Sequence, residues 1–127
     1  MSLPVAERDA LFKAFGRAFF KRDVDALYET VTDDFIWHTL DEHGKAKAVT
    51  GCDAVGAQLQ RRSTALENVR FEDVVYNHAP DATFMTFRLT ARRIETGEPH
   101  EEIGVERYTF RDGRIAVKDV YKKPNQS

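Results

Sequence analysis

One carboxylate in this sequence lies among residues that a strand would bury. In the segment 99–111, Glu106 alternates with Gly104 and Tyr108, so an extended chain places the three on one face. Burial there disfavours the charged carboxylate, which raises its pKa and suits it to act as an acid or hydrogen-bond donor. The other interpretation is an ion pair with a neighbour such as Lys118 or an arginine. The sequence leaves both interpretations open.

Other residue types with catalytic or metal-binding chemistry lie between positions 38 and 52. His38, Asp41, Glu42 and His43 are metal-ligand types, but their spacing matches no defined site, and we expect no metal. Cys52 is the only cysteine, so no internal disulfide is expected, and nothing near it suggests nucleophilic catalysis. The sequence has neither a glycine-rich phosphate loop nor a Ser-His-Asp order, and we expect no cofactor.

The segment 99–124 that contains Glu106 is predicted to be a β-hairpin. Asp112-Gly113 at its centre supplies the positive φ that a tight turn needs. Two earlier segments alternate apolar and polar residues with the period of a strand: 69–76 and 84–94. Together these segments predict a four-stranded antiparallel meander.

The N-terminal half is predicted to hold three helices. Apolar residues recur at helical spacing through 11–19. Gly16 lies inside this first helix, where we expect it to allow close packing against a neighbour. Asp23 can cap a second, shorter helix, and Thr50 or Asp53 can begin a third. The third helix presents four residues on one side: Val55, Leu59, Arg62 and Leu66.

One further strand is predicted between the second and third helices. The run Phe35–Leu40 is rich in aromatic and β-branched residues. Thr32-Asp33-Asp34 before it is predicted to be a turn, and the polar stretch 41–50 after it a loop. These elements predict an α+β fold in which three N-terminal helices pack on one side of a curved, predominantly antiparallel sheet.

Length and charge limit the classes of function. The 127 residues predict a single domain, 1–127, that buries a core without disulfide or metal support. The formal net charge is −2, and no cluster of lysines and arginines lies on a recognisable DNA- or RNA-binding motif. Both features argue against nucleic-acid binding. No apolar run approaches membrane-spanning length and no basic-then-apolar leader opens the sequence, so we expect a cytoplasmic protein without membrane attachment.

Several motifs are similar to those of one known superfamily. Asp23-Val24-Asp25-Ala26-Leu27, followed by Asp33-Asp34-Phe35-Ile36-Trp37-His38, resembles the helix-turn-strand signature of the nuclear-transport-factor-like superfamily. The greatest similarity is to its SnoaL-like and ketosteroid-isomerase-like branch. Thr50-Gly51-Cys52-Asp53-Ala54-Val55 resembles the start of that branch's third helix, and Tyr108–Ile115 resembles its last hairpin.

The resemblance implies a cone in which the helices close over the concave sheet face and leave a deep, mostly apolar pocket. Steroid isomerases of this fold use a base aspartate, a tyrosine and a protonated aspartate. With Asp33-Asp34 as anchor, these positions fall at Thr39, Phe15 and Glu106. Threonine cannot take a proton from carbon and phenylalanine donates no hydrogen bond, so we do not expect the steroid-isomerase mechanism. Asp41 is either a substitute base, if the strand end bulges, or a loop carboxylate.

Around Glu106 we expect a mostly aromatic pocket. Alternation brings seven residues to it: Phe15, Phe19, Trp37, Thr39, Met85, Phe87 and Tyr108. Such a lining fits a small hydrophobic or aromatic ligand, although the same residue types also build an ordinary core. One predicted function is cofactor-independent acid–base chemistry on a small hydrophobic carbonyl compound by an isomerase, dehydratase, cyclase or hydrolase, with Glu106 catalytic. The alternative is a non-catalytic dimeric ligand-binding or association module.

The outer face of the sheet predicts a homodimer. Four apolar residues are expected opposite the pocket side: Ile103, Val105, Ile115 and Val117. The helices can cover only one face, and monomers rarely leave such an apolar patch exposed. A second copy of the chain would bury it, with arginines at the rim.

Overall fold

The computed structural model describes residues 3–41 and 43–124. The chain forms nine elements in this order: α1 (Val5–Lys21), α2 (Val24–Tyr28), β1 (Val31–Leu40), β2 (Ala46–Thr50), α3 (Cys52–Ala65), β3 (Leu66–His78), β4 (Thr83–Arg93), β5 (Pro99–Arg111) and β6 (Arg114–Lys122). No helix in this part of the chain is long and apolar enough to cross a membrane.

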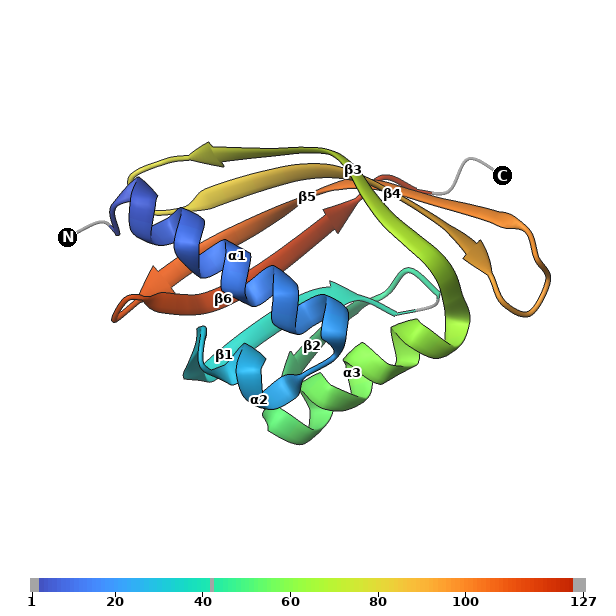
Figure 1. Ribbon diagram of the computed structural model, residues 1–127, viewed down its shortest axis with the longest axis horizontal. Helices are drawn as coiled ribbons and strands as arrows, with labels where there is room; N and C mark the ends of the chain where they lie inside the picture. Colours follow the sequence, from blue (N-terminus) through green and yellow to red (C-terminus); the bar gives the residue numbers. More distant parts are fainter. Residues whose placement is uncertain (1–2, 42, 125–127) are drawn as a thin grey trace.

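The described strands form one sheet in the order β2-β1-β6-β5-β4-β3. Neighbouring strands are antiparallel except for β1 and β6, which run parallel. Figure 1 shows α1 lying across the sheet, and α3 leading directly into β3. The α+β class with three helices and a predominantly antiparallel sheet is therefore confirmed.

Two local predictions are also confirmed. Asp112 and Gly113, which join β5 to β6, have φ values of 53° and 75°, as a two-residue hairpin turn of this kind requires. Asp23 caps α2, because its Oδ1 accepts a hydrogen bond from the Ala26 N–H at 3.1 Å. Both features depend on neighbours in sequence, which is why the sequence was sufficient to predict them.

Two predictions about the first part of the sheet are wrong. The stretch 41–50 is not all loop, because β2 pairs with β1 along its length. Val49 is the one buried residue of β2, so the strand has no apolar alternation to detect. Asp33 and Asp34 lie inside β1 and not in a turn; the register between β1 and β6 shifts there, and both residues remain exposed.

A bulge in β6 decides which of its side chains face the interior. Ile115 and Val117 pair with consecutive residues of β5, so Ala116 between them has no partner in the ladder. Ile115 therefore turns inward and is fully buried, whereas the sequence predicted it on the outer face. Lys118 also faces inward and is 4% exposed. The bulge thus places an aliphatic side chain and a cation on the same side.

The first helix is attached to the sheet by a buried arginine that the sequence did not single out. Arg8 in α1 is 2% exposed, and its guanidinium donates to carbonyl oxygens of Ala79, Pro80 and Ala82 around the β3–β4 turn. It also contacts the Thr83 hydroxyl. With this end of α1 held at the turn, three side chains of the helix pack into the core: Phe12, Phe15 and Ala18.

At two glycines, Gly104 and Gly16, we expect substitution by alanine to have opposite effects on stability. A Cβ on Gly104 would lie 2.2 Å from the Tyr121 carbonyl oxygen, so the two strands meet more closely there than any side chain permits. A Cβ on Gly16 would meet nothing within 4 Å, so the close packing expected at this helix position is absent.

We therefore expect Gly104→Ala to lower the free energy of unfolding by about 1–3 kcal/mol, because the strands must move apart. The matched change Gly16→Ala should raise it by about 0.5–1 kcal/mol through better helix propensity. Urea unfolding of both variants checks the pair. Equal effects of the two substitutions would contradict the role given to Gly104.

Candidate active site: a buried ion pair in an aromatic cage

Glu106 on β5 forms a buried ion pair with Lys118 on β6. Lys118 Nζ lies 3.2 Å from Glu106 Oε1, and the two residues are 4% and 5% exposed. The hydroxyl of Tyr108 donates to the same carboxylate oxygen. Of the two interpretations left open by the sequence, the ion pair is the one found.

The ammonium group of Lys118 lies among aromatic rings. Its Nζ is 4.2 Å from the ring centre of Phe19, 5.1 Å from Trp37, 5.3 Å from Phe15 and 5.8 Å from Tyr108. These distances are within the range of cation–π attraction, which strengthens where water is excluded. The rings come from α1, β1 and β5, so the cage exists only when helix and sheet have packed together.

Burial shifts the pKa of both groups that donate to Glu106, the Lys118 ammonium group and the Tyr108 hydroxyl. Burial lowers the pKa of Lys118, an effect that the nearby Glu106 carboxylate opposes. The pKa of Tyr108 is raised well above its usual value, first by burial and then by the charge of Glu106. Tyr108 therefore keeps its proton at neutral pH and acts as a donor.

A second acid–base cluster adjoins the first along β5 and β6. Glu102 lies 2.8 Å from Lys122 Nζ and 2.8 Å from His100 Nε2. Burial would raise the pKa of Glu102, but Lys122, Arg62 and the His100 hydrogen bond outweigh it and lower the pKa to about 2. Glu102 is therefore a carboxylate at neutral pH, bound to its own lysine.

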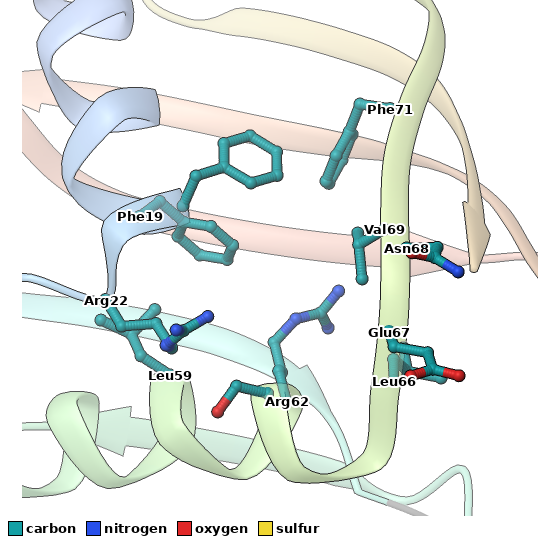
Figure 2. A pocket seen from close by; sticks show the side chains of 11 residues that line it. Phe19, Arg22, Leu59, Arg62, Leu66, Glu67, Asn68, Val69 and Phe71 are labelled. Atoms are coloured by element: carbon teal, nitrogen blue, oxygen red, sulfur yellow. The ribbon is translucent and has the colours of Figure 1, made fainter. Parts of the chain in front are cut away.

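Two cavities lie beside this interior, and Phe19, Phe20 and Phe71 line both of them. One of about 360 Å³ lies between the end of α1, α3 and the start of β3 (Figure 2). The other, of about 150 Å³, lies between α1 and β3 and is lined by Glu106, Tyr108 and Lys118, among others. A narrow space of about 10 Å³ next to Glu106 and Lys118 has room for little more than one water molecule.

The hydrogen bonds of this interior are made at Glu106 and leave one buried indole N–H without an acceptor. Tyr108 and Lys118 both contact the Oε1 atom of Glu106. The buried Trp37 Nε1 finds no acceptor among the described residues. A buried donor left unpaired in this way is costly, so the indole N–H of Trp37 is available to an acceptor on a ligand.

The residues predicted to form the pocket lie around the ion pair. Phe15, Phe19, Trp37 and Tyr108 surround Lys118, as described above. The other three predicted residues line the spaces next to Glu106: Met85 the 150 Å³ cavity, and Thr39 and Phe87 the narrow one.

Several residues of the site were missed. Lys118 was named only as a partner for Glu106, although it is the centre of the cage. Phe71 and Tyr76 line the cavities from β3, whose apolar alternation is interrupted where Asn68 and Asp73 take positive φ. Arg62 could have been recognised from the sequence as a candidate site residue, because it lies on the apolar side of α3, where a charged side chain needs an explanation.

The other candidates do not reach this interior. Asp41 caps the β1–β2 turn, where its Oδ1 accepts from the N–H groups of His43 and Lys45, so it is a loop carboxylate. Cys52 is exposed at the start of α3. Among the described residues no three His, Cys, Asp or Glu side chains are grouped as a metal would need. Glu42, one of the ligand-type residues, lies outside the described residues.

Comparison with known proteins identifies the family. The SnoaL-like domain family matches residues 12–118, which is most of the chain. The chain belongs to this SnoaL-like family. The resemblance drawn from its motifs, to the SnoaL-like branch of the superfamily, is thereby confirmed. No curated protein matched the sequence in a separate comparison.

Solved structures share the fold at low sequence identity. An NTF2-like protein from Burkholderia xenovorans superposes with a TM-score of 0.80 at 19% identity, covering 94% of this chain and 92% of that one. TerC, co-crystallised with polyporic acid, gives 0.75 at 16% identity and 92% coverage of both chains. A protein from Catenulispora acidiphila with a ketosteroid isomerase-like fold, in complex with trimethylamine, gives 0.71 at 17%, covering 87% and 83%.

In this SnoaL-like domain we expect the contributions of Glu106 and Lys118 to stability to be strongly coupled. Glu106→Gln or Lys118→Met alone should lower the free energy of unfolding by about 3–5 kcal/mol, because each leaves a buried group without its partner. The double variant Glu106→Gln/Lys118→Met should recover much of that loss. Urea unfolding at pH 7 measures all three.

The exposed pair of Arg111 with Asp34 provides the control. Asp34→Asn should change the unfolding free energy little, because water screens this pair. If the losses of the two single buried variants simply add in the double variant, Glu106 and Lys118 are not coupled.

Proposed function

We propose that this chain is a cofactor-independent enzyme that performs acid–base chemistry on a small hydrophobic carbonyl compound. In this proposal the helices and the concave sheet enclose the substrate in a cone-shaped pocket. One observation carries it: Glu106 is held by Lys118 and Tyr108 through Oε1, and the same residue lines a cavity.

Glu106 is suited to be the base that takes a proton from the carbon next to the carbonyl group. The C–H bond breaks, an O–H bond forms at Oε2, and the electron pair of the C–H bond becomes an enolate. Neutralising Glu106 leaves the positive charge of Lys118 without its counter-ion, so it can attract the enolate oxygen instead. Return of the proton to a different carbon completes an isomerisation.

The lining of the cavity suits an aromatic or otherwise flat substrate. Seven aromatic residues line the cavity beside Glu106: Phe12, Phe15, Phe19, Phe20, Phe71, Tyr76 and Tyr108. TerC was co-crystallised with polyporic acid, and the Catenulispora protein with trimethylamine. Both complexes support the view that this fold accepts small organic molecules.

Deuterium exchange tests the proposed proton abstraction without knowledge of the natural substrate. We expect the protein to accelerate exchange of the C1 protons of 2-tetralone in D₂O, followed by ¹H NMR, by roughly 10²-fold or more over buffer. Glu106→Gln should abolish the acceleration, and the double variant Glu106→Gln/Lys118→Met should do so in a more stable background. Asp41→Asn, which removes a loop carboxylate, is the control and should exchange as the wild type does.

Wild-type exchange no faster than buffer, or full exchange by Glu106→Gln, would overturn this assignment. The alternative is a non-catalytic ligand-binding module. It is favoured by the little free volume next to the ion pair, about 10 Å³ on one side. Binding of an aromatic ligand without any proton exchange would support that alternative.

We also propose that two copies of the chain associate through the outer face of the sheet. Ile103, Val105 and Tyr121 lie there on adjacent strands, with Ile103 37% and Tyr121 53% exposed. Ile115, which the sequence assigned to this patch, is buried on the inner side and contributes nothing to it. The remaining residues still leave apolar area that a second copy would cover.

We expect light scattering at micromolar concentration to give twice the mass of one chain. Ile103→Glu should shift the protein to monomer, because it places a charge in the covered patch. Val5→Glu, which changes an exposed apolar residue of α1, should leave the dimer intact. A monomer mass for the wild type would contradict the proposal.

A further inference from the structure

The 360 Å³ cavity combines an apolar wall with two arginines. Six of its residues are apolar: Phe19, Phe20, Leu59, Leu66, Val69 and Phe71. Arg22 enters from the end of α1, and Arg62 from α3. Figure 2 shows both guanidinium groups directed into the space between α1, α3 and β3.

Neither of these two positive charges forms an ion pair with a described residue. Nor does either guanidinium form a hydrogen bond with any residue in 3–41 or 43–124. Glu67 also lines the cavity, but Figure 2 shows its carboxylate on the far side of β3, directed away from both arginines. Two carboxylates lie nearby, the half-buried Glu102 and the buried Glu106, and each is paired with a lysine. The charge of Arg62 also acts on Glu102 and helps to lower its pKa. The cavity therefore has an excess of positive charge.

The backbone of Arg22 supports a role for its side chain. Arg22 ends α1 with φ 56°, in the left-handed region that favours glycine. Its N–H caps the helix by donating to the Phe19 carbonyl. Glycine would perform this backbone task with less strain, so the backbone gives no reason for an arginine. A strained residue at a cavity rim points to a function of the side chain.

We propose that this cavity binds the carboxylate of an aromatic acid, with Arg62 and Arg22 holding the carboxylate and the Phe19, Phe20 and Phe71 rings contacting the aromatic body. Arginine matches a carboxylate because its planar N–H groups donate in pairs. Phe19 and Phe71 also line the spaces next to Glu106, so a ligand held here by its acid group can direct a carbonyl towards that residue. Only this last step rests on the proposed function; the binding does not.

The same geometry excludes cationic ligands. Lys118 already occupies the aromatic cage, which is the arrangement that would otherwise attract an ammonium group. The two arginines would repel a cation at the cavity mouth. The inference thus concerns the sign of the ligand's charge as well as its aromatic body.

Calorimetric titration with three probes of one shape tests the inference: 1-naphthaleneacetate, its neutral amide and 1-naphthylmethylamine. At pH 7 the acid should bind roughly ten- to hundredfold more tightly than the amide, and the amine should not bind detectably. Arg62→Gln should reduce the affinity for the acid to that for the amide. Arg61→Gln, one residue away on the exposed side of α3, removes the same charge and should change neither affinity.

Arg22→Gly separates function from stability. It should weaken binding of the acid while keeping or raising the melting temperature, because glycine suits the left-handed position. A merely structural role for Arg22 predicts a lower melting temperature and unchanged affinity in the folded protein, which would remove Arg22 from the site.

Several outcomes overturn the inference: equal affinity for acid and amide, equal losses from Arg61→Gln and Arg62→Gln, or no binding of either probe at millimolar concentration. Glu106→Gln distinguishes it from the proposed function. That variant should keep the preference for the acid even though it loses proton exchange. Preserved acid binding without exchange in the wild type would reject the enzyme and leave the binding site in place.

Discussion

A carboxylate and an ammonium group share the interior of this sheet with almost no contact with water. Removing either charge from water is expensive, and their mutual attraction offsets that cost only when the geometry is good and other partners assist. Here the assistance comes from the Tyr108 hydroxyl and from the four ring faces around Lys118. The helix α1, the strand β1 and the hairpin β5–β6 must therefore all be in place for Glu106 and Lys118 to be tolerated.

Two local irregularities make this arrangement sterically feasible. The bulge at Ala116 lets Ile115 join the core and Lys118 face the same interior. Gly104 lets β5 approach the backbone of β6 more closely than a side chain would allow. Both occur in the hairpin that carries the ion pair, which fits the general tendency of bulges and glycines to direct side chains at functional sites.

The charged residues of the interior form two groups: acid–lysine ion pairs on β5 and β6, and two arginines at the larger cavity. Close to the core, Glu106 and Glu102 are each neutralised by a lysine, so the deep region is nearly balanced. At the larger cavity, neither Arg22 nor Arg62 forms an ion pair with a described residue, although the charge of Arg62 helps to lower the pKa of Glu102. In the proposed site, this arrangement favours an anionic group at the larger cavity and an uncharged reacting group beside Glu106, because Glu106 already has its own counter-ion.

The sequence by itself determined the class of fold, the cap at Asp23, the turn at Asp112-Gly113 and the face of β5 on which Glu106 and Tyr108 are buried. These features depend on residues a few positions apart, and periodicity reports them directly. Tertiary structure alone decided that Glu106 is paired with Lys118, that Ile115 faces inward and that 46–50 joins the sheet. An ion pair, a bulge and an edge strand are set by the register between strands distant in the chain. Residue patterns within one strand contain no information about that register.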